Sequence, residues 1–192
     1  MCGIVGKYNF STGEPVSAEL IRARTDKIVY RGPDDSGIYT QGSIGLGHRR
    51  LSIIDLSPLG HQPMASADES IWITFNGEIY NFQELRKDLI SKGYQFRSHS
   101  DTEVIICLYQ EYGEECLKFL RGMFAFAIWD RQRQELFLAR DRYGIKPLYY
   151  AMRGNTFLFG SEIKAMLAHP ACQVELDKEG LLEYFTFQNF FT

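Results

Sequence analysis

The chain has 192 residues, with 21 Lys and Arg against 24 Asp and Glu, a formal net charge of −3 and 45% hydrophobic residues. This is the composition of an ordinary globular domain, and a chain of this length supports one hydrophobic core. The weakly acidic balance, without a Lys/Arg cluster, argues against binding to nucleic acid or to an anionic membrane. The longest apolar run, residues 123–129, is far too short for a membrane helix and no signal peptide is apparent, so we expect a cytoplasmic protein.

The four cysteines point to a reducing environment. They form no C-x-x-C pair, so we expect neither a structural zinc site nor a redox pair, and no other metal site. Cys107 stands on the apolar face of an expected helix and should be a small buried hydrophobe. Cys2 differs, because it follows the initiator Met directly and needs a separate argument.

In chain order, the first part of the sequence predicts strands with a single helix among them. A strand over residues 5–10 leads through a turn rich in Ser, Thr, Gly and Pro into a helix over residues 18–30. Segments rich in β-branched and aromatic residues, separated by Gly, Pro, Ser and Asp, then predict strands over residues 36–41, 44–54 and 71–76.

The second part combines helices in blocks with short strands. Apolar residues at helical spacing predict helices over 81–92 and 101–112, with Ser100 or Asp101 suited to cap the second. We expect short strands over 123–130, 135–140, 148–151 and 156–160, and final helices over 162–169 and 178–185. Strands spaced as hairpins do not fit βαβ alternation, so the fold class should be α+β, a sandwich of antiparallel sheets in one domain.

The end of the chain is rich in aromatic residues. Residues 184–192 contain Tyr184, Phe185, Phe187, Phe190 and Phe191. An exposed apolar patch of this kind marks a surface for a partner. We therefore expect the chain to be a fragment of a longer protein.

Cys2 has the position of an N-terminal nucleophile. Once Met1 is removed, the α-amino group of Cys2 titrates near a pKa of about 8 and can take the proton of the adjacent thiol without a histidine. Nucleophile and base then belong to one residue. By itself this signal is weak, since many chains carry Cys at the second position by chance.

Two further segments allow a structural and a functional interpretation. Asn76-Gly77 is a favoured hairpin-turn pair, but the Asn76 amide and the Gly77 N–H would also suit an oxyanion hole. Arg49 and Arg50 are neighbours in an expected strand, where successive side chains face opposite ways, so at most one can enter a given pocket. That arginine is either a surface residue or a bidentate clamp for a carboxylate.

These residues occur within a specific, ordered set of motifs: Met-Cys-Gly at 1–3, R-G-P-D at 31–34, R-L-S-I-I-D at 50–55, N-G-E-I-Y-N at 76–81 and R-D-R-Y-G-I-K-P-L-Y at 140–149. Over essentially the whole chain, this pattern resembles the glutaminase domain of glutamine-hydrolysing asparagine synthetases. That family belongs to the class II glutamine amidotransferases, which are N-terminal nucleophile hydrolases. The resemblance implies a four-layer αββα sandwich, with residues 1–192 as one glutamine amidotransferase type 2 domain.

The resemblance also implies the roles of individual residues. Cys2 would be the nucleophile with its own amine as base, and Asn76 and Gly77 would form the oxyanion hole. Arg31 and Asp34 would be the opposite charges of a braced loop. The implied glutamine-binding groups are Arg50 for the α-carboxylate, Glu78 and Asp101 for the α-ammonium, and the backbone of Leu51, Ser52, Ile53 and Ile54 as pocket lining.

The implied reaction is hydrolysis of glutamine to glutamate and ammonia through a Cys2 thioester. Family members continue into a synthetase domain, but this sequence has no Ser-Gly-Gly or Walker-type phosphate loop. We therefore expect glutamine and the C-terminal synthetase domain of the full-length chain as partners, and no cofactor in this domain. ATP and Mg would serve only the synthetase domain, which would amidate aspartate with the ammonia.

Several alternatives stay open. A relative with another carboxylate acceptor fits the same residues. If Met1 is retained, the acylated nitrogen of Cys2 cannot act as a base, and the chain is a non-catalytic glutamine-binding module. A sugar-phosphate or purine-pathway branch of the same class is disfavoured by the motif at 50–55. The oligomeric state is undetermined, and a homodimer is compatible with the sequence.

Overall fold

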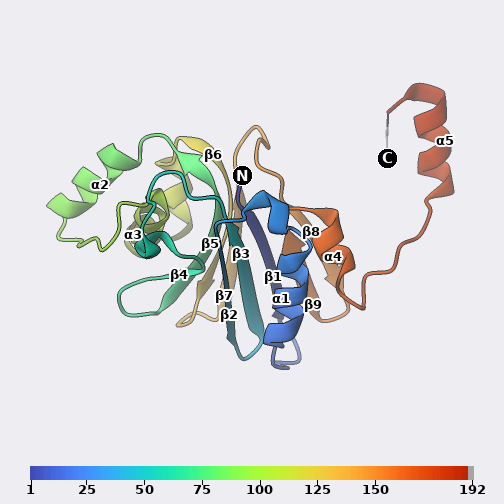
Figure 1. Ribbon diagram of the computed structural model, residues 1–192, viewed down its shortest axis with the longest axis horizontal. Helices are drawn as coiled ribbons and strands as arrows, with labels where there is room; N and C mark the ends of the chain where they lie inside the picture. The colour runs from blue at the N-terminus through green and yellow to red at the C-terminus, as the bar shows by residue number, and fades with distance from the viewer. Residues whose placement is uncertain (190–192) are drawn as a thin grey trace.

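The computed structural model describes residues 1–189 as two β-sheets packed face to face between two layers of helices (Figure 1). Neighbouring strands are antiparallel in both sheets. The first sheet has the order β2-β3-β1-β9-β8, with β1 Gly3–Asn9, β2 Asp35–Gln41, β3 Ile44–Arg50, β8 Tyr149–Arg153 and β9 Thr156–Gly160. The second has the order β4-β5-β6-β7, with β4 Met64–Ala65, β5 Ile71–Ile79, β6 Gly122–Asp130 and β7 Glu135–Arg140.

Helices cover the outer face of each sheet (Figure 1). The first sheet carries α1 Ala18–Asp26 and α4 Ile163–Leu167, and the second carries α2 Phe82–Ser91 and α3 Asp101–Tyr112. Short 3-10 helices span Val29–Arg31, Pro58–Gly60 and Gly113–Lys118, and the last helix is α5 Lys178–Phe187. This is the predicted αββα order of layers. Within residues 1–189, every helix is too short or too polar to cross a membrane.

Strand alternation divides the apolar residues among separate cores. Ile4, Leu46 and Phe159 of the first sheet pack against Ala125 and Trp129 of the second. The opposite faces of the two sheets pack against α1 and against α2 with α3. Cys107 is buried in the α3 core, as predicted. The two sheets therefore share one buried apolar interface, and the candidate site lies at one end of it.

The predicted strand over 44–54 is wrong beyond Arg50. Cys2 Sγ accepts a hydrogen bond from the Leu51 N–H at 3.3 Å, and Asp34 Oδ2 accepts one from the Ser52 N–H at 2.8 Å. Side chains thus take the N–H groups that a sheet partner would otherwise use. The apolar character of Ile53 imitates a strand, yet this residue is 69% exposed.

Two other predicted elements, a helix and a strand, also end at residues other than those expected. The helix expected over 18–30 stops at Asp26, because the Arg49 guanidinium donates to Thr25 O at 3.4 Å and pairs with the Asp26 carboxylate. Asn76-Gly77 is no hairpin turn. The strand expected over 71–76 continues to Ile79, and both residues lie inside β5, opposite β6.

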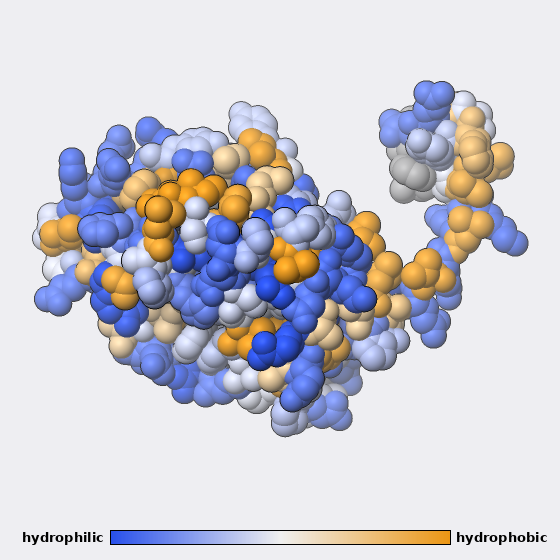
Figure 2. Space-filling view, in the orientation of Figure 1, coloured by the Kyte–Doolittle hydropathy of each residue, from blue (hydrophilic) through white to orange (hydrophobic). Residues whose placement is uncertain are grey.

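The segment after α4 lies away from the sandwich (Figure 1), and Figure 2 shows apolar residues along it. In α5, Tyr184 is 48%, Phe185 74% and Phe187 62% exposed. The predicted aromatic patch is therefore exposed in these three residues, whereas Phe190 and Phe191 lie outside the described residues.

Candidate active site

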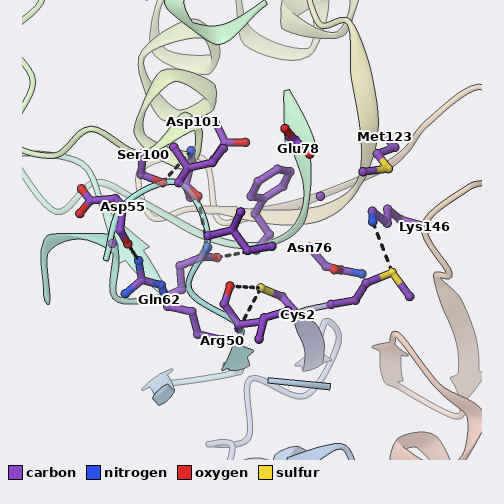
Figure 3. Close-up of a pocket in the computed structure, with 18 residues that line it drawn as sticks. Cys2, Arg50, Asp55, Gln62, Asn76, Glu78, Ser100, Asp101, Met123 and Lys146 are labelled. Atoms are coloured by element: carbon purple, nitrogen blue, oxygen red, sulfur yellow. Dashed lines mark hydrogen bonds between the residues drawn. The ribbon is translucent and has the colours of Figure 1, made fainter. Parts of the chain in front are cut away.

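A pocket lies where the start of β1, the loop after β3, strand β5 and the start of α3 meet (Figure 3). Among the residues assigned from the sequence, those that line it are Cys2, Arg50, Leu51, Ile53, Ile54, Asn76, Gly77, Glu78 and Asp101. Ser52 is outside this lining, with its N–H directed to Asp34. The fold thus brings together residues from separate parts of the chain.

Cys2 precedes β1, a central strand of the first sheet, so its backbone is held from several sides. The Arg31 Nε donates to the Cys2 carbonyl at 2.9 Å, while Arg31 also pairs with Glu162 at 2.8 Å. Arg31 and Asp34 therefore each have a structural role, through separate contacts. Leu51 N–H donates to Sγ at 3.3 Å, and the thiol faces Leu51 O at 3.6 Å.

The thiol of Cys2 needs a base to become nucleophilic. Burial raises its pKa, although the hydrogen bond from Leu51 and the positive charges of the N-terminus and Arg50 act in the other direction. A thiol with a raised pKa is protonated at neutral pH, and the thiolate is the reactive form. The Cys2 thiol would therefore have to give its proton to a neighbouring group before it could act as a nucleophile.

Strand β5 directs one backbone N–H into this pocket. Alternate residues of an antiparallel strand send their N–H groups to the same side. On the side away from β6, Phe75 N–H donates to Gln62 Oε1 at 2.7 Å and Ile79 N–H donates to Asp101 Oδ2 at 3.0 Å. Gly77 lies between them and lines the pocket. Its N–H therefore points along the same open edge toward the pocket.

Asn76 supplies a second donor beside the first. Thr74 on the same face of β5 donates to Gly47 O of the first sheet at 3.2 Å, so Asn76 also faces that sheet. Asn76 is 1% exposed, and its Nδ2 has no hydrogen-bond partner within the described residues. Leaving a buried donor unpaired costs about 1–3 kcal/mol. Such a donor in a pocket is suited to an oxygen supplied by a ligand.

The two neighbouring arginines have different environments. Arg50 points into the pocket and donates to Ser57 O at 3.2 Å and to Asp55 O. A Cβ at Gly60 would overlap the Arg50 guanidinium, so a side chain there would displace it from this position. Arg49 lies on the opposite face of β3, against the end of α1. Of these two arginines, Arg50 is therefore the one positioned to bind an anion in the pocket.

Two carboxylates lie across the pocket from this arginine (Figure 3). Asp101 begins α3 and is 4% exposed, while Glu78 is exposed. Burial raises the pKa of Asp101 to about 6, despite hydrogen bonds from the Ile79 and Thr102 N–H groups. Ser100, and not Asp101, caps the helix, since its side chain accepts from Thr102 N–H. The pocket thus has the Arg50 guanidinium on one side and the acids Glu78 and Asp101 on the other, which suits the two charges of an α-amino acid. Asp55 and Lys146 also line it.

Gln62 and Lys146 line the pocket but are absent from the predicted site. Gln62 bridges β5 and α3, because its Oε1 accepts from Phe75 N–H and its Nε2 donates to Thr102 Oγ1 at 3.2 Å. No local pattern marks this residue. Lys146 belongs to the motif at 140–149, which indicated the family but not a place in the site.

Comparisons with known proteins agree with this geometry. Residues 1–192 match the family described as glutamine amidotransferase domain. Asparagine synthetases [glutamine-hydrolyzing] 3 and 1 of Bacillus subtilis are 45% and 46% identical over 96% and 98% of this chain. Amidase chyE of Penicillium rubens is 44% identical over 88% of the chain. The chain spans 30% of each of these synthetases and 26% of the amidase.

Solved structures share the fold. The glutamine phosphoribosylpyrophosphate amidotransferase of B. subtilis has a TM-score of 0.74 at 22% identity, over 87% of this chain and 43% of that one. A structure of the allosteric regulatory enzyme of purine biosynthesis has a TM-score of 0.73, also at 22% identity and with the same coverage. At this identity the likeness concerns the fold alone. The family match over residues 1–192, however, means that this chain belongs to the glutamine amidotransferase domain family.

Proposed function

We propose that this domain hydrolyses glutamine to glutamate and ammonia, with Cys2 as the nucleophile. The observation that carries the proposal is the meeting of the Cys2 thiol with the unpaired Asn76 amide and the edge N–H of Gly77 in one pocket. A nucleophile beside two N–H donors suits the tetrahedral intermediate of acyl transfer, in which a carbonyl oxygen becomes an oxyanion.

The charges of the pocket support glutamine as the substrate. The Arg50 guanidinium uses part of its donors on the Ser57 and Asp55 carbonyls and keeps others for the α-carboxylate. Asp101 and Glu78 supply negative charge for the α-ammonium. A partly buried site of this kind should reject analogues that lack either α-group, because its own charges would then be unpaired.

The reaction needs only groups of this chain, glutamine and water. After removal of Met1, the Cys2 amine accepts the thiol proton and the thiolate attacks the side-chain amide carbon of glutamine. The oxyanion is bound by Asn76 and Gly77. The amine then gives its proton to the departing nitrogen, ammonia leaves, and a γ-glutamyl thioester of Cys2 remains. Water attacks the thioester, passes a proton through the amine back to sulfur, and releases glutamate.

We also propose that the ammonia serves an ATP-dependent synthetase domain of the full-length protein, in the cytoplasm. The asparagine synthetase relatives support this, since this chain covers only 30% of the length of each. ATP and Mg would bind to that domain and not to this one, with aspartate as the acceptor. Two fungal relatives named amidases, chry2 and chyE, are 45% and 44% identical to this chain. Another carboxylate acceptor is therefore the second candidate.

The test is glutamate release from glutamine by this chain, after intact mass has established that Met1 is absent. Cys2→Ala should abolish release, whereas Cys172→Ala, which removes another partly exposed thiol, should leave it unchanged. A preparation that retains Met1 should be inactive, because its Cys2 nitrogen is an amide. Release that continues at the wild-type rate in Cys2→Ala would refute the proposal.

A further inference from the structure

Lys146 places an ammonium group in the pocket beside Met1 (Figure 3). The residue is 6% exposed, and its Nζ contacts Met1 Sδ at 3.4 Å. Within residues 1–189, no carboxylate forms an ion pair with this ammonium. Burial of a charge without an ion-pair partner is unfavourable, so this ammonium in the pocket calls for an explanation.

The loop before Lys146 is built to hold it in place. The Asp141 carboxylate accepts hydrogen bonds from the N–H groups of Lys146 at 3.0 Å, Ile145 at 2.8 Å and Phe124 at 3.2 Å. The Arg140 Nε donates to the Lys146 carbonyl at 2.7 Å. Both backbone polar groups of Lys146 are therefore fixed to buried or partly buried side chains. The side chain of Lys146 therefore extends toward Met1 from a fixed backbone position.

The position of Lys146 is close to the nitrogen of Cys2. Met1 Sδ is only a few covalent bonds from that nitrogen, so with the contact of 3.4 Å the ammonium lies within about 10 Å of it. Removal of Met1 turns this nitrogen into the α-amine that serves as the base. It also removes the sulfur contact of Lys146.

We infer that the Lys146 ammonium keeps the Cys2 amine in its neutral, basic form at neutral pH. This inference rests on the proposed function, and Lys146 acts through Cys2 without touching the reacting atoms. A nearby positive charge disfavours protonation of the amine. At about 10 Å and an effective dielectric constant of about 20, the amine pKa falls by about one pH unit. An ordinary α-amine with a pKa of about 8 is mostly protonated at neutral pH, so this decrease supplies several times more base.

The other charges around Cys2 are compensated when glutamine binds. Arg50 from β3 meets the α-carboxylate, and Glu78 from β5 and Asp101 from α3 meet the α-ammonium. The remaining charged groups have partners in the chain, namely Arg31 with Glu162 at 2.8 Å and Asp55 with the N–H groups of Ser57 and His99, each at 2.9 Å. Among the cations described around Cys2, Lys146 is then the one without a carboxylate partner.

The test is the pH profile of kcat for glutamine hydrolysis, because kcat reports the base in the enzyme with glutamine bound. Lys146→Met should move the acid limb upward by about one pH unit, with a several-fold loss at neutral pH, recovery at alkaline pH and little change in KM. Lys146→Arg keeps the charge and should keep the wild-type limb. Lys87→Met, which removes an exposed lysine of α2, is the control for net charge. An acid limb that does not move in folded Lys146→Met overturns the inference.

A second measurement does not require turnover. The pH dependence of Cys2 alkylation by iodoacetamide, followed by mass spectrometry, should shift upward in Lys146→Met as well, because the same charge favours the thiolate. If wild type releases no glutamate, the proposed function fails. An alkylation profile that does not move in Lys146→Met then overturns the inference, because the Lys146 charge does not act at Cys2, whereas an upward shift supports it. If Lys146→Met does not fold, the pH profile of glutamine hydrolysis by the wild type decides. An acid limb at or above the ordinary amine pKa of about 8 overturns the inference, and an acid limb clearly below about 8 supports it.

Discussion

Asp101 should make the fold less stable at neutral pH than it would be without this charge. The residue is 4% exposed, and burial raises its pKa from 3.8 to about 6. A carboxyl group with a raised pKa binds its proton more tightly in the folded chain than in the unfolded one. Its favourable contribution is therefore complete below about pH 4 and is lost as the pH rises through about 6. The difference between the two limits is about 3 kcal/mol.

Asp101→Asn removes the charge and keeps an oxygen that can accept from Ile79 N–H. At alkaline pH this variant should be more stable than wild type by up to about 3 kcal/mol, and the difference should fade toward about pH 4. The KM for glutamine should rise roughly 10- to 100-fold, because the amide cannot pair with the α-ammonium. Urea denaturation across this pH range measures the first effect, and glutamine kinetics measure the second.

Asp141 is a matched control, because its pKa is shifted in the opposite direction to that of Asp101. It is also buried, at 6% exposure, but hydrogen bonds led by the one from Lys146 N–H outweigh the effect of burial and lower its pKa. Its ionised form stabilises the fold at neutral pH, and this contribution is lost as the pH falls through the lowered pKa. Asp141→Asn should therefore be less stable than wild type at neutral pH, with a smaller difference in acid. The reasoning is refuted if Asp101→Asn loses stability at alkaline pH, or if both variants follow the same trend.

The remaining predictions concern the donors and the arginines. Asn76→Ala should lower kcat on the order of 10² to 10³-fold with little change in KM, and a loss seen mainly in KM would contradict its role as an oxyanion donor. Gly77→Ala should be destabilised by about 1–3 kcal/mol, because its Cβ would overlap Met123 O. An unchanged melting temperature would show that β6 can move to accommodate the Cβ without cost. Arg50→Met should raise KM for glutamine roughly 10- to 100-fold. Arg49→Met, on the other face of β3, should leave KM unchanged.

The parts of the fold that sequence reasoning predicts correctly are those with local causes. The helix over 101–112 and the strands over 135–140 and 156–160 have the expected bounds, because their period and their flanking turns lie within the segment itself. The end of β3 has a distant cause, since the Leu51 N–H is taken by Cys2 Sγ. No pattern around Leu51 could reveal that contact.

In the candidate site, too, the residues with a local signal could be predicted and those that depend on distant contacts could not. Strand alternation shows that Arg49 and Arg50 face opposite ways, but it does not show which face carries the pocket. The motifs identify Asn76 and Gly77, yet a turn remains an equal interpretation until β6 is known to pair with them. Gln62 bridges β5 and α3 through contacts 13 and 40 residues away in the chain. Such residues carry no local signal.

Three polar or charged groups of the site lower the stability of the unliganded fold, and the proposed function accounts for each of them. The Asn76 amide has no partner within the described residues, the Asp101 carboxylate has a raised pKa, and the Lys146 ammonium lacks an acid partner there. Each lowers the stability of the unliganded fold, because buried polar and charged groups favour pairing. The proposed substrate supplies an oxygen for the first and an ammonium for the second. The third remains uncompensated because, in our inference, its charge acts on the base and must not be neutralised.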